Sequence, residues 1–179
     1  MSEWAIACIP TSTSLCQSRL LAIPVRVLLD NVRSLYNVGS FFRTCDAVGV
    51  ERMHLCGITG RPPGKAISKT ALGAEERVPW DHHWNAVEVL TRARMEGLRI
   101  AAIETREDAI PLFDWAPAAP VCLVFGNEVD GVRPPLLALA DECVRIPMLG
   151  TKRSLNVATA GGVVLYEALR KLGGLTRGT

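Results

Sequence analysis

The chain has 179 residues and a mass of 19.4 kDa, with 49% hydrophobic residues, 21% charged residues and a net charge of +2. This length suits one domain with its own core, and the composition is that of a folded protein and not of a disordered one. The mildly basic balance permits a nucleic-acid partner but does not indicate one, because such a partner is indicated by local clustering of basic side chains.

The residues that most often bind structural metals are scattered along the chain. None of the six cysteines belongs to a CxxC pair or a Cys/His cluster, so we expect no zinc site. Several lie in apolar runs, as Cys122 does within 121–125, which favours buried, reduced thiols. His82 and His83 are adjacent and cannot share one helix face as ligands, so a surface or helix-cap role is expected.

The N-terminal segment, residues 1–24, is predicted to be an arm with one short helix, followed by a single domain over 25–179. It lacks the basic region and the apolar stretch of a signal peptide. No segment reaches the roughly 20 apolar residues that cross a bilayer. With reduced thiols, this predicts a cytoplasmic protein.

From Val25 onward the pattern alternates between strands and helices, which is typical of a mostly parallel sheet flanked by helices. Asn37 is predicted to cap the first helix and Gly49 to end it. The predicted strands cover 25–29, 52–56, 98–103, 121–125 and 144–147, and the predicted helices cover 37–48, 83–96 and 155–172, with loops at 60–65 and 111–120.

Two nucleotide-binding motifs are absent. The loop at 60–65 resembles a phosphate loop, but that motif needs glycine at position 59 and serine or threonine at 66, where Thr59 and Ala66 stand. The turn at 30–34, after the first strand, lacks the GxGxxG pattern of dinucleotide-binding folds. Dinucleotide binding is therefore disfavoured.

The first informative segment, residues 31–44, follows a predicted strand and opens a helix. Asn37 and Arg43 lie six residues apart there. Helix N-termini after strands favour anionic groups, because free N–H donors point outward, and a guanidinium suits phosphate. The residues alone leave open a structural alternative, in which Asn37 only caps the helix and Arg43 is solvated.

The second segment, 123–132, runs from an apolar strand into Gly126, Asn127 and Glu128. Ligands bind beyond the carboxyl ends of strands in open α/β sheets, Gly126 would permit close approach of a ligand, and Glu128 offers an acceptor. The alternative is a simple turn in which Asn127 and Gly131 adopt positive φ.

The third segment, 146–161, joins a strand end to a helix that opens at Ser154, through a loop rich in Gly, Thr and Lys. Ser154 is interpretable as an N-cap alone. Asn156 in the first turn of that helix is unfavourable for helix propensity, which suggests that it has a polar task.

Together, the three segments resemble the SpoU/TrmH-like RNA 2′-O-methyltransferases of the SPOUT superfamily. The patterns NxxxxxNxGxxxR, LVFGNExxG and IPMxGxxxSLNVAxA occur in the family's order, and the resemblance spans residues 25–172. It implies an enzyme that transfers a methyl group from S-adenosylmethionine to a ribose 2′-hydroxyl in RNA. No metal is implied, because the sulfonium already activates the methyl group.

The resemblance also implies a deep C-terminal trefoil knot over about residues 121–172, in a homodimer with its active site at the interface. The knot loops, around 126–131 and 146–156, would wrap the methyl donor. The implied cofactor-binding residues are Glu104, Thr105, Gly126, Ile146, Met148 and Leu155. The implied catalytic residues are Asn37, Arg43, Glu128, Ser154 and Asn156.

In this family the arginine at the position of Arg43 is usually assigned to activation of the ribose hydroxyl. A guanidinium has a pKa above about 12 and seldom gives up its proton. We therefore expect Arg43 to clamp the adjacent phosphate and so to orient and acidify the 2′-hydroxyl, whose proton passes to a neutral base or to the phosphate.

Basic residues near the motif loops or the last helix are candidate RNA contacts, although a single basic residue is more often a solvated charge. They are Arg33, Arg61, Lys65, Lys69, Lys152, Arg153, Arg170 and Lys171. Many relatives carry a separate N-terminal RNA-binding domain, and a pattern that begins at Val25 leaves no room for one, which favours a compact tRNA over ribosomal RNA.

Three alternatives stay open: the same reaction on ribosomal RNA, a catalytically silent module that binds RNA or the cofactor, and another nucleotide-binding α/β domain acting on small molecules. The joint presence of the five implied catalytic residues argues against the silent module. The absent phosphate-binding motifs argue against the small-molecule domain.

Overall fold

The computed structural model describes residues 22–173, so the helix expected within the N-terminal arm lies outside the described part. These residues form one sheet of seven strands in which every neighbouring pair is parallel. In spatial order the strands are β3 (Trp80–His83), β2 (Val50–Cys56), β1 (Ile23–Asp30), β6 (Val121–Phe125), β4 (Arg99–Ile103), β7 (Glu142–Arg145) and β5 (Ile110–Pro111). The predicted parallel sheet is confirmed.

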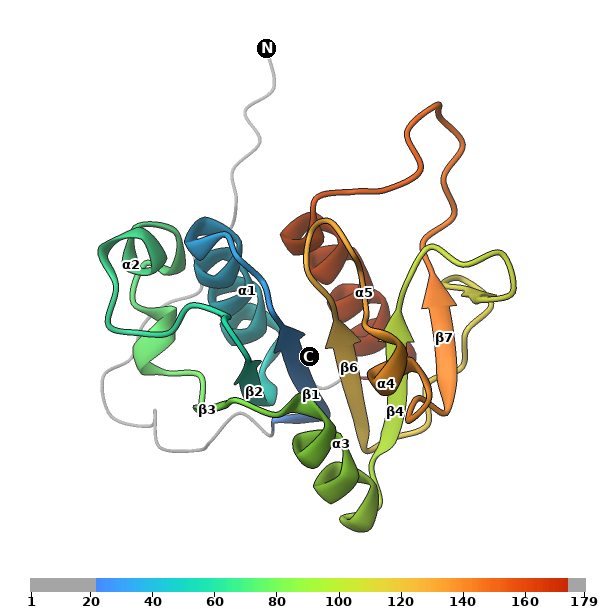
Figure 1. Ribbon diagram of the computed structural model, residues 1–179, viewed down its shortest axis with the longest axis horizontal. Helices are drawn as coiled ribbons and strands as arrows, with labels where there is room; N and C mark the ends of the chain where they lie inside the picture. The colour runs from blue at the N-terminus through green and yellow to red at the C-terminus, as the bar shows by residue number, and fades with distance from the viewer. Residues whose placement is uncertain (1–21, 174–179) are drawn as a thin grey trace.

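Helices cover both faces of this sheet (Figure 1). They are α1 (Leu35–Val48), α2 (Lys65–Ala71), α3 (Ala86–Met95), α4 (Pro134–Leu137) and α5 (Val157–Lys171), with a 3-10 turn, η1 (Ala74–Glu76). Side chains alternate between the faces along a strand. Val27 of β1 therefore packs with the α1 and α5 layer, whereas Leu28 packs with α3 and α4.

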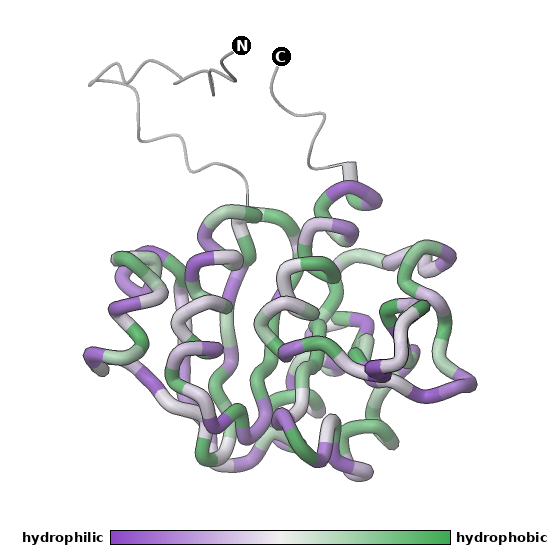
Figure 2. Tube along the Cα trace, turned by 90° about the horizontal axis from the view of Figure 1, so that it is seen from above, coloured by the Kyte–Doolittle hydropathy of each residue, from purple (hydrophilic) through white to green (hydrophobic). Residues whose placement is uncertain are grey.

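Hydropathy follows this layering. The strands of the centre are drawn mostly in the hydrophobic colour, and many hydrophilic residues lie in turns at the periphery (Figure 2). All five residues of β6 are buried, because the strand lies in the middle of the sheet and is covered on both faces. A parallel strand with both faces covered reads as a continuous apolar run, which is how the sequence of 121–125 was recognised.

Helices α1 and α5 lie side by side on one face of the sheet and approach each other closely. Gly161 of α5 makes this approach possible, since a Cβ at that position would overlap the ring of Phe41 on α1. Phe41 in turn packs edge-on against Phe125 of β6, with ring centroids 5.0 Å apart. The first and last helices of the domain are thereby fixed against the central strand.

Two predicted helix caps are wrong. Helix α1 is capped by Ser34, whose Oγ accepts from the backbone N–H of Asn37, so Asn37 lies inside the first turn. Helix α5 is capped by Asn156, whose Oδ1 accepts from the backbone N–H groups of Ala158 and Thr159, so Ser154 is not a cap. The predicted stop of α1 at Gly49 is confirmed, since this residue has the left-handed φ of 72°.

The helix predicted over 83–96 is shorter than expected. It begins at Ala86 with Asn85 as its cap, because residues 80–83 pair with β2 as the edge strand β3. The strand expected over 144–147 lies two residues earlier and ends before Pro147, which has no N–H for a ladder. The elements α2, β3, β5 and α4 were not predicted at all, and all of them are short.

The cysteines and the helices bear on two further expectations. Cys45, Cys56, Cys122 and Cys143 are free thiols, and burial raises the pKa of Cys122 to about 12. Within residues 22–173 there is no helix with the length and apolar character that a membrane span requires.

Candidate active site

A cavity of about 410 Å³ opens at the carboxyl ends of β4, β6 and β7. Two loops form its walls, residues 126–133 after β6 and residues 146–156 between β7 and α5, and the second loop rises well above the strand ends (Figure 1). All six residues implied in cofactor binding line the cavity: Glu104, Thr105, Gly126, Ile146, Met148 and Leu155. Sequence positions spread over more than fifty residues thus meet at one edge of the sheet.

The loop at 126–133 is held tightly to the sheet. Gly126 lies against the carbonyl group of Gly131, where a Cβ would overlap it, and Gly131 has the left-handed φ of 67°. Asn127 closes the turn, since its Oδ1 accepts from the backbone N–H groups of Val129 and Asp130. The glycine expected to admit a ligand therefore admits the loop's own backbone, and Asn127 acts through its side chain and not through a positive φ.

Glu104 fastens this loop to the end of β4. Its Oε2 accepts from the backbone N–H of Val132 at 2.8 Å, and its Oε1 accepts from the backbone N–H of Thr105 at 2.8 Å. Both oxygens already have partners within the chain, so Glu104 shapes the wall of the cavity as well as lining it.

An ion pair between a buried carboxylate and a partly exposed guanidinium, which the sequence did not reveal, anchors the far end of the same loop. Asp30, at the end of β1, has 1% of its surface exposed. The guanidinium of Arg133 donates to both of its carboxylate oxygens, at 2.6 and 2.8 Å. A charged residue directly after an apolar strand was the available signal, and its partner 103 positions away could not be identified without the fold.

Glu128 lies at the N-terminus of α1, in the position that the sequence suggested for an external anion. Its carboxylate accepts from the backbone N–H groups of Arg33 and Ser34, both at 3.2 Å, and from Nδ2 of Asn37 at 2.9 Å. Partial burial on its own raises the pKa of Glu128, but these hydrogen bonds outweigh it and hold the pKa below its ordinary value. Glu128 is thus an ionised acceptor at neutral pH.

Asn37 connects the two walls of the cavity. Its amide nitrogen donates to Glu128 of the first loop, while its Oδ1 accepts from Nδ2 of Asn156 at 3.1 Å. Asn156 is therefore both the cap of α5 and a donor to α1. The propensity argument that singled it out was wrong, because Asn is favoured at a cap, but the polar task that it predicted is present.

The second wall has few contacts that hold it in place before its last residue, Asn156. Ser154 and Leu155 line the cavity and are exposed, as is the whole stretch 149–156. Met148 and Ile146 present apolar side chains from the beginning of the loop. Within the described part of the chain, residues 146–155 form no hydrogen bond with any other segment.

Arg43 is separated from the other four residues of the implied catalytic set. It lies on α1, exposed, and does not line the cavity. Six residues at about 100° each place it about 240° around the helix from Asn37. Arg43 instead shares a face of α1 with Tyr36, seven positions before it, and within the described chain it forms no hydrogen bond with Asn37, Glu128 or Asn156.

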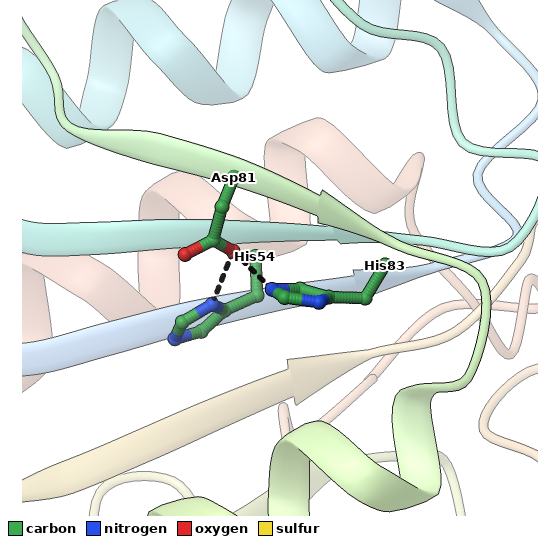
Figure 3. A group of neighbouring side chains, drawn as sticks. All are labelled: His54, Asp81 and His83. Atoms are coloured by element: carbon green, nitrogen blue, oxygen red, sulfur yellow. Dashed lines mark hydrogen bonds and ion pairs between the residues drawn. The ribbon is translucent and has the colours of Figure 1, made fainter.

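One group of side chains in residues 22–173 is arranged as metal ligands would be, and it lies away from the cavity (Figure 3). Nδ1 of His54 and Nε2 of His83 both contact Oδ1 of Asp81, at 2.7 and 2.9 Å. Arg52 contacts the other oxygen of Asp81 at 3.2 Å, and Arg92 contacts Nδ1 of His83 at 3.4 Å. Two guanidinium groups thus already supply positive charge where a cation would bind.

This cluster also corrects the role expected for His83. The residue belongs to β3 and is no helix cap, and it joins its strand to His54 of β2 through Asp81. Burial alone raises the pKa of Asp81, but the hydrogen bond with His54 and the electrostatic attraction of His54, His83 and Arg52, in that order, outweigh it and lower the pKa to about 2. The cluster holds the edge strand to the sheet.

Five of the eight candidate RNA contacts lie at two opposite ends of the domain. Arg33, Arg61 and Arg153 lie at the carboxyl edge of the sheet, where Arg153 lines the cavity. Lys171 lies at the other end of α5, where its Nζ donates to the carbonyl groups of Leu112, Phe113 and Trp115. Lys171 is therefore a structural residue, and Arg170 beside it pairs with Glu167 of its own helix.

Comparison with known proteins places this site in context. The model of the SpoU rRNA Methylase family matches residues 24–166. A tRNA (guanosine(18)-2′-O)-methyltransferase of Thermus thermophilus is 38% identical over 145 residues, which is 81% of this chain and 74% of the relative. A 23S rRNA (guanosine-2′-O-)-methyltransferase of Vibrio parahaemolyticus is 30% identical over 83% of this chain and 60% of its own length.

Solved structures agree with these sequence relatives. The TrmH/SpoU tRNA modifying enzyme of A. aeolicus superposes with a TM-score of 0.79 and 31% identity, over 88% of this chain and 81% of that one. An AdoMet-bound rRNA methyltransferase from Sinorhizobium meliloti gives a TM-score of 0.76 and 31% identity, over 82% and 56%. A structure described for 2-OH methylation of C/U34 on tRNA gives 0.75 and 29%, over 84% of this chain and 97% of that chain.

Proposed function

Because the chain belongs to the SpoU methylase family, we propose that it methylates a ribose 2′-hydroxyl of tRNA with the methyl group of S-adenosylmethionine. The reaction class follows from the family: the chain is an S-adenosylmethionine-dependent RNA 2′-O-methyltransferase. The observation that carries the proposal is the cavity at the strand ends, where two loops distant in sequence meet beside the Glu128–Asn37–Asn156 chain of hydrogen bonds.

The cavity fits the methyl donor. Its volume of about 410 Å³ lies within the roughly 300–1,000 Å³ of small-molecule sites. Ile146, Met148 and Leu155 offer apolar contact for an adenine ring, and loop backbone offers polar groups for the rest. When bound, S-adenosylmethionine supplies a methyl group that its sulfonium has already activated.

The work left to the protein is to position the ribose and to receive its proton. Asn37 and Asn156 present amide groups between the two walls, where they can orient a hydroxyl. Glu128 fixes Asn37 from the other side and orients its amide. Ser154, exposed on the cavity wall, is placed to contact the ribose or its neighbouring phosphate.

We assign tRNA as the substrate over ribosomal RNA, and a cytoplasmic site of action follows from that assignment. The relative with the highest identity given above acts on tRNA, and a tRNA-methylating structure is matched over 97% of its length. The ribosomal relatives extend well beyond the matched region, since the chain covers 56–60% of them.

A homodimer completes the site in this proposal. Arg43 does not line the cavity of its own chain and lies on the same face of α1 as the exposed Tyr36, and the neighbouring helix α5 also exposes apolar side chains, Val163 and Tyr166. Exposed apolar groups on two adjacent helices mark a protein interface. Pairing of this layer between two copies would bring Arg43 of one copy to the cavity of the other, where it clamps the phosphate next to the target ribose.

Mixed dimers test this arrangement. Arg43→Ala and Asn156→Ala are each expected to lose methyl transfer by about ten-fold or more when tested alone. If Arg43 acts across the interface, random mixing of the two variants restores about a quarter of wild-type activity, since half of the dimers hold one intact site of two. Action within one chain predicts no recovery at all, and a monomer by sedimentation would contradict the arrangement directly.

The trefoil knot is part of the same proposal, over residues 121–172. The strand order supports it, because β6 inserts between β1 and β4, which precede it in sequence, and the chain then passes to β7 before α5 returns to pack on α1. In such a path the two cavity walls are consecutive loops of one knotted segment.

The direct test of the function is transfer of a labelled methyl group from S-adenosylmethionine to unmodified total tRNA and to ribosomal RNA, followed by nucleoside mapping. We expect label in a 2′-O-methylnucleoside of tRNA. Label on a base would contradict the reaction type, and label in ribosomal RNA alone would contradict the substrate. Calorimetric titration with S-adenosylmethionine distinguishes a silent module, which binds without turnover, from a domain that does not bind at all.

A further inference from the structure

Trp84 immediately follows β3 at the carboxyl edge of the sheet, and 75% of its surface is exposed. It is the most exposed aromatic side chain among residues 22–173. Trp84 does not line the cavity and does not lie on α1 or α5, the helices proposed to form the dimer interface. It follows β3, which is the edge strand next to β2. An indole with this exposure offers a large apolar face at an edge where ligands bind.

The indole is held in place in spite of its exposure. The ring of His82 meets it edge to face, with centroids 5.0 Å apart at 88°. Nε2 of His82 donates to the carbonyl group of Gly57 at 3.0 Å, which leaves Nδ1 to accept from Arg61 at 2.9 Å. His82 therefore fixes both Trp84 and Arg61, an aromatic face and a cation, in one arrangement.

The base of this arrangement is rigid. Strand β3 has four residues and lies at the edge of the sheet, where backbone pairing alone would hold it weakly. The carboxylate of Asp81 bonds His54 of the neighbouring strand and His83 of its own strand (Figure 3). The residue that precedes Trp84 is thus fastened to β2, so the indole projects from a fixed support.

The distance to the cavity suits a polynucleotide. Strand β3 is three strands from β6, which at about 4.8 Å per strand places Trp84 about 14 Å from Gly126 along one edge. A few nucleotides cover such a span. The pairing of an aromatic face with a fixed guanidinium also matches single-stranded RNA, which offers a base to stack and a phosphate to neutralise.

We propose that Trp84 stacks on an unpaired base of the substrate RNA, a few nucleotides from the methylated ribose, and that Arg61 contacts a phosphate beside that base. This inference rests on the proposed function and adds a recognition site to it. Aromatic stacking is tolerant of base identity, so Trp84 selects an unpaired, accessible loop and leaves the choice of nucleotide to the cavity.

The test compares Trp84→Ala, Trp84→Phe and the matched control Met95→Ala. Met95 is 83% exposed and is the last residue of α3. It lies near the amino ends of the strands, whereas Trp84 lies at their carboxyl ends. We expect Trp84→Ala to raise both the Kd and the KM for tRNA by about ten-fold or more. The kcat at saturating tRNA and the Kd for S-adenosylmethionine stay within about two-fold, Trp84→Phe keeps most of the affinity, and Met95→Ala changes nothing.

Two readouts separate stacking from a merely structural role. Titration with tRNA should quench the tryptophan fluorescence of the wild type, and Trp84→Phe should abolish most of that quenching. Arg61→Ala should reduce the slope of log Kd against log salt by about one unit, as loss of one phosphate contact does.

The outcomes distinguish this inference from the function on which it rests. A wild type that binds S-adenosylmethionine but methylates no RNA overturns both. An active wild type whose Trp84→Ala variant binds tRNA equally well overturns the stacking site alone. The same holds if Trp84→Ala changes the mass of the assembly in solution, since the indole then belongs to a protein interface.

Discussion

The two walls of the cavity are built in opposite ways. Residues 126–133 are fastened by the Asp30–Arg133 ion pair, by Glu104 and by their own turn. In the second loop, residues 149–156 are exposed, and residues 146–155 form no hydrogen bond to other segments of the described chain. The first wall is preorganised before any ligand arrives. The second wall loses conformational entropy when it becomes ordered on binding, and the contacts of a ligand or a second subunit have to offset this loss. We therefore expect substitutions at the first wall to change the stability of the protein, and we expect ligand binding to order mainly the second wall.

The largest expected effect comes from a substitution that releases the first wall from the sheet. Arg133→Ala leaves the carboxylate of Asp30 buried without its cationic partner, with the side-chain amide of Asn31 still donating to it. This should lower the free energy of unfolding by about 3 kcal/mol in urea denaturation. Replacing Asp30 by Asn in the same chain should recover part of this loss, because the uncompensated charge is removed. Arg106→Ala, in an exposed pair, is the control and should leave stability unchanged. Equal effects of the two arginine variants would contradict the anchoring role.

Ligand binding should mainly order the second wall. S-adenosylhomocysteine at about 100 times its Kd should raise the free energy of unfolding by about 2.7 kcal/mol. In hydrogen exchange, the backbone N–H groups of 149–156 should gain most of the new protection, and those of 126–133 should change little. Protection spread evenly over both loops would show that the walls do not differ in preorganisation.

Asn156 allows the cap to be separated from the contact between the walls. Asn156→Ala should cost about 1 kcal/mol of stability through loss of the α5 cap. Asn156→Ser keeps a capping oxygen but cannot reach Asn37, so its stability should stay near that of the wild type. Both variants should lose methyl transfer by about ten-fold or more. Full activity in the serine variant would confine Asn156 to capping.

The smallest expected effect concerns Glu128 and pH. Its pKa is lowered in the folded protein, so it contributes stability that is present above its unfolded pKa of about 4.3 and is lost as the pH falls through the folded value. Glu128→Gln should thus be less stable than the wild type at pH 7 by under about 1 kcal/mol. The difference should shrink below about pH 4. A constant difference would mean that ionisation is irrelevant there.

Much of the fold was readable because its strands are apolar runs punctuated by glycine. Short edge elements such as β3 escaped, since a strand of four half-buried residues carries no clear periodicity. Cap positions were misassigned by two or three residues because Ser34 and Asn37, like Ser154 and Asn156, are all chemically suited to capping. Only the geometry of each turn selects between them.

The lining of the cavity was predicted in part. The six residues that the family resemblance implied in cofactor binding line one cavity, because the order of the motifs along the chain determines which strand ends become neighbours. The partnership of Asp30 with Arg133 and the separation of Arg43 from Asn37 were not predictable. The first depends on contact between distant segments, and the second depends on which face of α1 the sheet covers.

The contact between Gly161 and the ring of Phe41 sets the position of α5 on α1. Asn156, the cap of α5, lies five residues or about 7.5 Å from this contact in the direction of the cavity. A single methyl group at position 161 would tilt the helix and lift Asn156 away from Asn37 without altering one polar atom. The alignment of the two walls therefore depends on a packed position of α5 that contributes no polar atom to the cavity.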